Sequence, residues 1–152
     1  MDKLTARAGV RCGLGTLAVC LSLFMAGPVL AEPVGPSGFT RAEIAAFARE
    51  VQGALERHDT RRLAHLSQWP LRVNVAPGKV RLVGRSALPR EFGRVFSPAL
   101  IAKVRAQEAD TLFENADGVM FGDGELWAHG VCEDRVCRRA RLLLFAVNPP
   151  PT

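Results

Sequence analysis

The sequence predicts an α+β fold in which N-terminal helices pack on an antiparallel sheet. Apolar residues recur at helical spacing between Phe39 and Arg57. From Leu112 onward this spacing disappears, and short alternating runs are separated by glycine-containing turns. Two cysteines, Cys132 and Cys137, bracket the turn between the last two runs. The helical half therefore precedes the half that supplies most of the sheet, an order typical of α+β proteins.

The first 31 residues have the three parts of a secretory signal peptide. The basic head contains Lys3, Arg7 and Arg11. An uncharged run of 16 residues follows at 12–27, which is shorter than the roughly 20 residues that a helix needs to cross a bilayer. Small side chains at Val29 and Ala31 place the cleavage site after Ala31. We therefore expect a periplasmic or secreted chain with no stable membrane insertion, and lipid attachment at Cys20 is the alternative.

The mature chain of 121 residues suits one domain with one hydrophobic core. It carries 17 basic and 14 acidic residues and has no basic run interleaved with aromatic residues, so we expect no nucleic-acid partner. The predicted parts are a flexible tether rich in Pro and Gly at 32–38, a single α+β domain at 39–148 and a C-terminal tail at 149–152.

The first helix is marked by its N-terminal signals. Order is expected to begin at Phe39. Thr40 and Glu43 have the spacing of a capping box, and Phe39 and Ile44 are placed as the hydrophobic staple around it. Helical spacing of apolar residues from Ile44 onward predicts an amphipathic helix with one buried face.

The middle of the chain predicts short helices around a hairpin. Thr60 is expected to cap a short helix that ends at Trp69-Pro70, because proline cannot continue a helix. Residues 71–75 and 80–83 alternate on either side of a Pro-Gly turn, which predicts a β-hairpin. Two further helices are expected after the caps Ser86 and Ser97.

The last third of the mature chain predicts a series of antiparallel strands. Asp117-Gly118 and Asp123-Gly124 are dipeptides that favour tight hairpin turns. The expected strands are residues 119–121, 125–132 and 138–147. An even pair of cysteines in an exported chain favours a disulfide between Cys132 and Cys137, with four residues at the hairpin tip. Such a bond would fix the register of the two strands.

The order of elements resembles that of the nuclear transport factor 2-like superfamily, which includes ketosteroid isomerases and polyketide cyclases. The segment LFENADGVMFGDGELW, from Leu112 to Trp127, is similar to a segment of uncharacterised exported members. The resemblance covers about 39–148. It implies a cone-like α+β fold whose curved sheet encloses a cavity between its concave face and the first helix. The chain contains no tyrosine, which removes the phenolic oxyanion donor of the isomerase members.

Residues of the late and early strands are the candidates for binding a ligand. In a strand, Trp127 and His129 share one face, whereas Ala128 and Gly130 lie on the other, where small residues suit packing against a helix. Trp127 and His129 would then face a pocket or solvent. The polar positions of the early strand add Arg72 and Asn74. The alternative is that Trp127 is a core residue and His129 a surface residue.

A basic group surrounds the cysteine hairpin. Its members are Arg135, Arg138, Arg139 and Arg141. In an exported protein this group could meet an acidic partner, a phosphate-bearing glycan or anionic lipid. The alternative is a solvated strand face.

These patterns favour a small noncatalytic exported module that binds a small ligand or an envelope protein. The alternative is a small cavity enzyme of isomerase or cyclase type that uses His129 or an acid near the strand ends. The acids are Asp117, Asp123 and Glu125, of which the first two are better explained by their turns. The three histidines lack metal-ligand spacing, and we expect neither a metal nor a cofactor.

Export predicts that the protein recovered from the periplasm or the medium begins at Glu32. Intact-mass measurement of the recovered protein checks this expectation. A mass that still includes Met1 would rule out cleavage.

Overall fold

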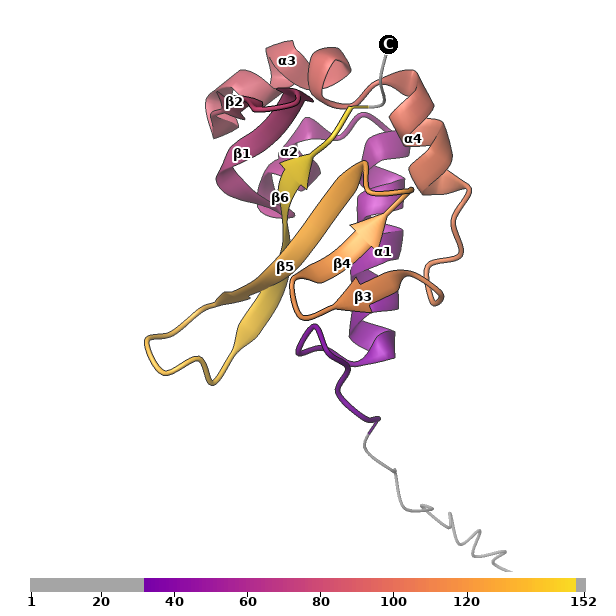
Figure 1. Ribbon diagram of the computed structural model, residues 1–152, viewed down its shortest axis with the longest axis vertical. Coiled ribbons are helices and arrows are strands. Elements are labelled where there is room, and N and C mark those ends of the chain that lie inside the picture. The colour runs from indigo at the N-terminus through magenta and orange to yellow at the C-terminus, as the bar shows by residue number, and fades with distance from the viewer. Residues whose placement is uncertain (1–31, 150–152) are drawn as a thin grey trace, which may run out of the picture. The chain divides into compact units, whose positions relative to one another are not determined.

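The computed structural model describes residues 32–149, in which helices and strands form an α+β fold (Figure 1). The elements in order are α1 (Arg41–Glu56), α2 (Thr60–His65), β1 (Ser67–Ala76), β2 (Lys79–Val83), a 3-10 turn (Arg85–Ala87), α3 (Leu88–Val95), α4 (Pro98–Arg105), β3 (Phe113–Asn115), β4 (Gly118–Phe121), β5 (Leu126–Cys132) and β6 (Ala140–Val147). The predicted signal peptide and residues 150–152 lie outside the described residues. Within residues 32–149, no helix is long and apolar enough to span a bilayer.

The strands form one mixed sheet in the order β2-β1-β6-β5-β4-β3. The predicted hairpin of β1 and β2 is confirmed, and β3 to β6 are antiparallel neighbours. The expectation of a fully antiparallel sheet is wrong at one place, because β1 and β6 run parallel. Parallel neighbours need a long connection, and α3, α4 and β3 to β5 all lie between these two strands in the sequence.

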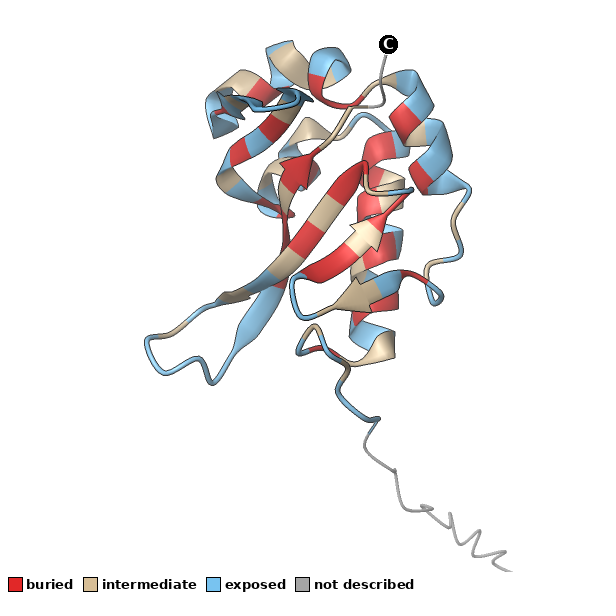
Figure 2. Ribbon diagram, viewed as in Figure 1, coloured by how far each residue is buried: buried red, intermediate tan, exposed pale blue. Residues whose placement is uncertain are grey.

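Helices and strands contribute to one hydrophobic core cluster. In Figure 1, α1 passes behind β4 and β5, and Figure 2 shows buried residues along both α1 and these strands. The helices supply, among others, Ile44, Ala48, Val51, Leu88, Val95 and Val104. The strands supply, among others, Leu71, Val73, Val119, Leu126, Ala128 and Leu144. The regular alternation along β1 and β5 therefore separates a core face of the sheet from an outer face.

The helix caps match the sequence signals in two of four cases. The capping box of Thr40 and Glu43 is confirmed, and the Ser97 hydroxyl accepts a hydrogen bond from the Leu100 N–H at 3.2 Å. Thr60 is not the cap of α2, because Asp59 takes that place and accepts from the Arg62 N–H. Ser86 lies inside the 3-10 turn, and α3 begins without a side-chain cap.

Two proline-containing stretches are more ordered than expected. Val34 forms a bridge with Thr40, and the Ser37 hydroxyl donates to the Glu114 carboxylate at 2.6 Å, so order begins before Phe39. The short helix ends at His65, and β1 runs through the cis Trp69-Pro70 peptide. Proline is tolerated there because the register between β1 and β6 is irregular at this point.

The turn between β3 and β4 depends on Asn115 and Gly118. The Asn115 side chain accepts hydrogen bonds from the N–H groups of Asp117 and Gly118 at 2.9 and 3.2 Å, a role that the sequence had suggested for Asp117. Gly118 has a φ of 140°. A Cβ at this residue would overlap the carbonyl oxygen of Ala128 in β5. The close approach of β4 to β5 therefore requires a glycine here.

We predict that Gly118→Ala lowers the free energy of unfolding by about 2 kcal/mol, because it adds both backbone strain and a clash with the neighbouring strand. The matched control is Gly93→Ala in α3, where an added Cβ meets nothing within 4 Å. This control should raise stability by about 0.5–1 kcal/mol, since alanine favours a helix. Urea unfolding measures both variants, and equal stabilities for the two would contradict the prediction.

Candidate functional site

The outer face of the sheet carries a row of side chains that crosses every strand. We define the outer face by Trp127, His129 and Arg72, which lie outside the core cluster. Trp127 is paired with Ala146 on one side and Met120 on the other, and Ala146 is paired in turn with Arg72. Directly paired residues share a face, so the row extends to the sheet edges. Its two ends are Leu82 in β2 and Phe113 in β3, which are 64% and 53% exposed.

The predicted division of β5 into two faces is confirmed. Ala128 is fully buried, and a Cβ at Gly130 would lie 2.8 Å from the Phe39 ring just before α1. Trp127 and His129 are half-buried on the opposite side, so the alternative that placed Trp127 in the core is wrong. This arrangement also departs from the cavity that the resemblance implies, because these two residues face away from α1.

His129 is held by two residues that sequence reasoning missed. Its ring stacks on Phe145, with ring centroids 4.3 Å apart, and its Nε2 lies 2.5 Å from the Gln68 side-chain oxygen. Phe145 is the extra residue where the pairing of β5 with β6 shifts by one, so a bulge turns its ring toward His129. Burial lowers the pKa of His129. The imidazole is therefore neutral at pH 7 and acts as a positioned hydrogen-bonding group.

The two candidates from β1 are joined to the end of β6. Arg72 Nε donates to the Asn74 side-chain oxygen at 2.8 Å, and Asn74 in turn donates to Asn148 at 2.5 Å. The Asn148 amide donates to the carbonyl oxygen of Gly124 at 2.5 Å. Asn74 and Asn148 are thus occupied by structural hydrogen bonds, whereas the guanidinium of Arg72 stays exposed on the outer face.

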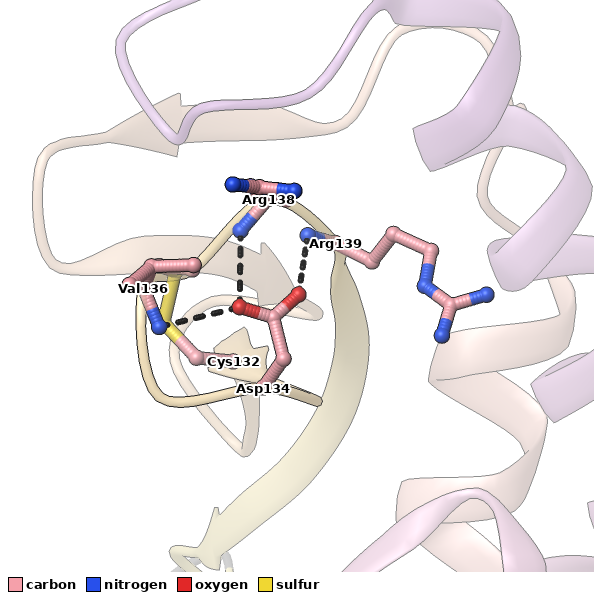
Figure 3. The surroundings of a disulfide bond; sticks show 6 residues. Cys132, Asp134, Val136, Arg138 and Arg139 are labelled. Carbon is pink, nitrogen blue, oxygen red and sulfur yellow. Dashed lines mark hydrogen bonds between the residues drawn. A yellow bond between two sulfur atoms is a disulfide. The ribbon is translucent and has the colours of Figure 1, made fainter.

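The arginine hairpin, which we define as residues 132–141, projects from the sheet between β5 and β6 (Figure 1). The predicted disulfide is confirmed: Cys132 and Cys137 are bonded, and their Cα atoms lie 4.8 Å apart (Figure 3). The bond closes a short loop and is worth about 2 kcal/mol on chain-entropy grounds. It holds the two sides of the hairpin together below the tip.

Asp134 organises the tip of the arginine hairpin, and sequence reasoning did not assign it this role. Its carboxylate accepts hydrogen bonds from the N–H groups of Val136, Arg138 and Arg139 at 3.0–3.2 Å (Figure 3). The Arg138 N–H, ahead of the other backbone donors, holds the pKa of Asp134 below its usual value. The carboxylate is therefore ionised and turned toward the backbone, which leaves the arginine side chains directed outward.

No family model, curated protein or solved structure matches this chain. The resemblance to the nuclear transport factor 2-like superfamily therefore stays a prediction. Within residues 32–149, no group of three His, Cys, Asp or Glu side chains is placed to hold a metal ion.

The candidate acids occupy structural positions. Glu125 is buried, and its carboxylate forms an ion pair with Lys103 of α4 and accepts the Asp123 N–H at 2.5 Å. Burial acts to raise the pKa of Glu125, but the hydrogen bond from Lys103 and those from the backbone outweigh it, so the pKa lies below the usual value. Asp123 is exposed and also bonds Lys103, at 2.9 Å. Asp117 is exposed at the β3–β4 turn.

These contacts attach α4 to the β4–β5 turn and give Glu125 no proton to donate at pH 7. Gln107 completes the attachment, because its side-chain oxygen accepts the Gly122 N–H at 2.6 Å. Sequence reasoning did not identify Lys103 and Gln107, because they are distant in the chain from the β4–β5 turn and neither lies in a distinctive motif.

We predict that Glu125→Gln lowers the free energy of unfolding by about 1–2 kcal/mol at pH 7, because it removes a buried charge-assisted hydrogen bond. A carboxyl whose pKa is lowered by folding stabilises the protein above its unfolded pKa, near 4.5, and loses this contribution as the pH falls through the folded pKa. The stabilities of the variant and the natural protein should therefore converge as the pH falls from 4.5 through the folded pKa of Glu125.

Urea unfolding at pH 7 and pH 3 checks the prediction. Glu108→Gln is the matched control, since Glu108 is exposed in the loop that follows α4. It should change stability by less than about 0.5 kcal/mol. A Glu125→Gln deficit that stays the same at both pH values would show that the charge is not its source.

Proposed function

We propose that this chain is a noncatalytic exported binding module that docks on an acidic envelope protein through the arginine hairpin and the outer face. In this proposal it is an exported member of the nuclear transport factor 2-like superfamily with a cone-like arrangement of helices on a curved sheet. The order of elements supports that assignment. The observation that carries the proposal is the braced hairpin with outward arginines.

The hairpin is preorganised for a negatively charged surface. The disulfide and the Asp134 carboxylate fix the backbone, so little conformational entropy is lost when the tip binds. Among the described residues, Arg135, Arg138 and Arg139 form no ion pair, and all three are exposed. Arginine is enriched at protein interfaces because its planar group binds carboxylates in a bidentate manner.

The outer face supplies apolar area on the sheet from which the hairpin projects. Trp127 and Met120 are half-buried neighbours in the middle of the row, and Phe113 and Leu82 are exposed at its ends. Tryptophan, methionine and arginine are the residue types that concentrate at binding surfaces. Arg72 adds a positive charge to the same row. An acidic partner with apolar side chains at its centre fits this composition.

The positions of the acids favour binding over catalysis. Glu125 is ion-paired with Lys103, and the neutral His129 is held by Gln68 and Phe145. A general acid needs a proton to donate at the working pH, whereas the lowered pKa of Glu125 leaves its carboxyl ionised.

The test is capture of envelope proteins on the mature chain, with variants that separate the two surfaces. We expect Arg138→Glu with Arg139→Glu to reduce recovery of the specific partner at least about tenfold, because two attractive charges become repulsive. Recovery by the natural chain should also fall as salt is raised. Trp127→Ala should reduce recovery to a similar degree if the outer face forms the centre of the interface.

The matched control is Arg49→Glu with Arg61→Glu, which makes the same change in charge on exposed positions of α1 and α2. This control should recover the partner as the natural chain does. If the control loses the partner as well, attraction by net charge replaces the hairpin as the explanation. If both the hairpin variant and Trp127→Ala keep full recovery, the proposed surfaces are rejected.

A further inference from the structure

A separate polar cavity lies where β1 begins, between the end of α2 and β6. Its volume is about 190 Å³. The polar residues that line it are His65, Ser67, Gln68, Arg85 and Arg141. None of the described residues that line it is acidic, so the charges at its wall are those of two guanidinium groups. Arg141 has one acidic neighbour, since its Nε lies 3.7 Å from Glu133, and both side chains remain partly exposed.

Ser67 is the unusual member of this cavity. It is 4% exposed, and its hydroxyl has no hydrogen-bond partner among the described residues. A buried hydroxyl without a partner destabilises the folded state, so nearly all buried hydroxyls in proteins are paired. Ser67 also lines this positively charged cavity, so a bound group that reaches its hydroxyl would complete the site.

The hydrogen bonds of the neighbouring residues leave further donors. Arg85 Nη2 lies 3.2 Å from His65 Nδ1. A guanidinium can only donate, so Nδ1 accepts this hydrogen bond and Nε2 is the nitrogen of the ring that can donate. Gln68 uses its oxygen for His129, which leaves its NH₂ group as a donor. The polar side chains of the cavity therefore present donors almost exclusively.

We propose that this cavity binds an oxyanion of the size of phosphate. Arginine matches the geometry of such oxyanions, the Ser67 hydroxyl supplies a buried donor, and the volume admits one tetrahedral group. The site shares only Arg141 with the arginine hairpin of the proposed docking surface, and its other lining residues lie outside that hairpin. Free phosphate and phosphate monoesters both carry this oxyanion, so the site could take either.

Titration of the mature chain with inorganic phosphate, followed by amide NMR at constant ionic strength, tests the site. We expect saturable shifts at residues 64–69, 85 and 141, and we expect none with chloride. Arg85→Gln should weaken binding at least about tenfold, because it removes a charge-assisted pair. Arg49→Gln, on the exposed side of α1, is the matched control and should bind as the natural chain does. Glycerol phosphate in place of phosphate distinguishes a monoester site from a site for the free ion.

Ser67→Ala separates a ligand-binding hydroxyl from a structural one. Without phosphate this variant should be as stable as the natural chain or more stable, since it removes an unpaired buried group. With phosphate, the natural chain should gain more in thermal stability than the variant does.

Three results would overturn the site: shifts that do not saturate, shifts that chloride reproduces, or binding that survives Arg85→Gln unchanged. A loss of stability in phosphate-free Ser67→Ala would show that the hydroxyl is already paired within the protein, and it would equally reject the proposal.

Discussion

β6 holds the two halves of the sheet together. It pairs in parallel with β1, which belongs to the early hairpin, and antiparallel with β5, which belongs to the late strands. Its core side supplies Leu142, Leu144 and Val147, and its outer side supplies Leu143 and Ala146. Both neighbours are paired with this one strand. Its register therefore fixes the positions of the core residues, the row on the outer face and the hairpin at its N-terminal end.

This shared register explains why the candidate residues of the outer face are neighbours. The bulge at Phe145 turns an aromatic ring under His129, and the next paired residue, Ala146, lies between Arg72 and Trp127. Small side chains on the core side of β5 leave its larger ones to the outer face. Glu125, by contrast, serves the architecture, since its pair with Lys103 fixes α4 against a glycine-rich turn. The structural acid thus lies in the turn just before β5, whereas the arginine hairpin lies at the other end of this strand.

Local patterns predicted the features that depend on neighbours in the sequence. Helical spacing and a capping box identified α1, and alternation with turn dipeptides identified every strand except the short β3. The small residues Ala128 and Gly130 suggested that their side of β5 packs against a helix, but the sequence left open which side faces the core. The parallel pairing of β1 with β6 could not be predicted in this way, because it joins segments more than 60 residues apart that carry no shared motif. The same holds for the unpaired hydroxyl of Ser67, whose neighbours come from four separate elements.

The disulfide at the base of the arginine hairpin ties the shape of this surface to the redox state of its surroundings. Bonds of this kind persist in oxidising compartments and are reduced in the cytosol. In a reduced chain, the hairpin would rely on the Asp134 carboxylate alone to order its tip. An exported chain with both constraints would present its arginines in one arrangement, whereas a precursor still in the cytosol would present a looser loop. Oxidation would then act as a maturation step, because the hairpin would bind its partner weakly until the disulfide forms.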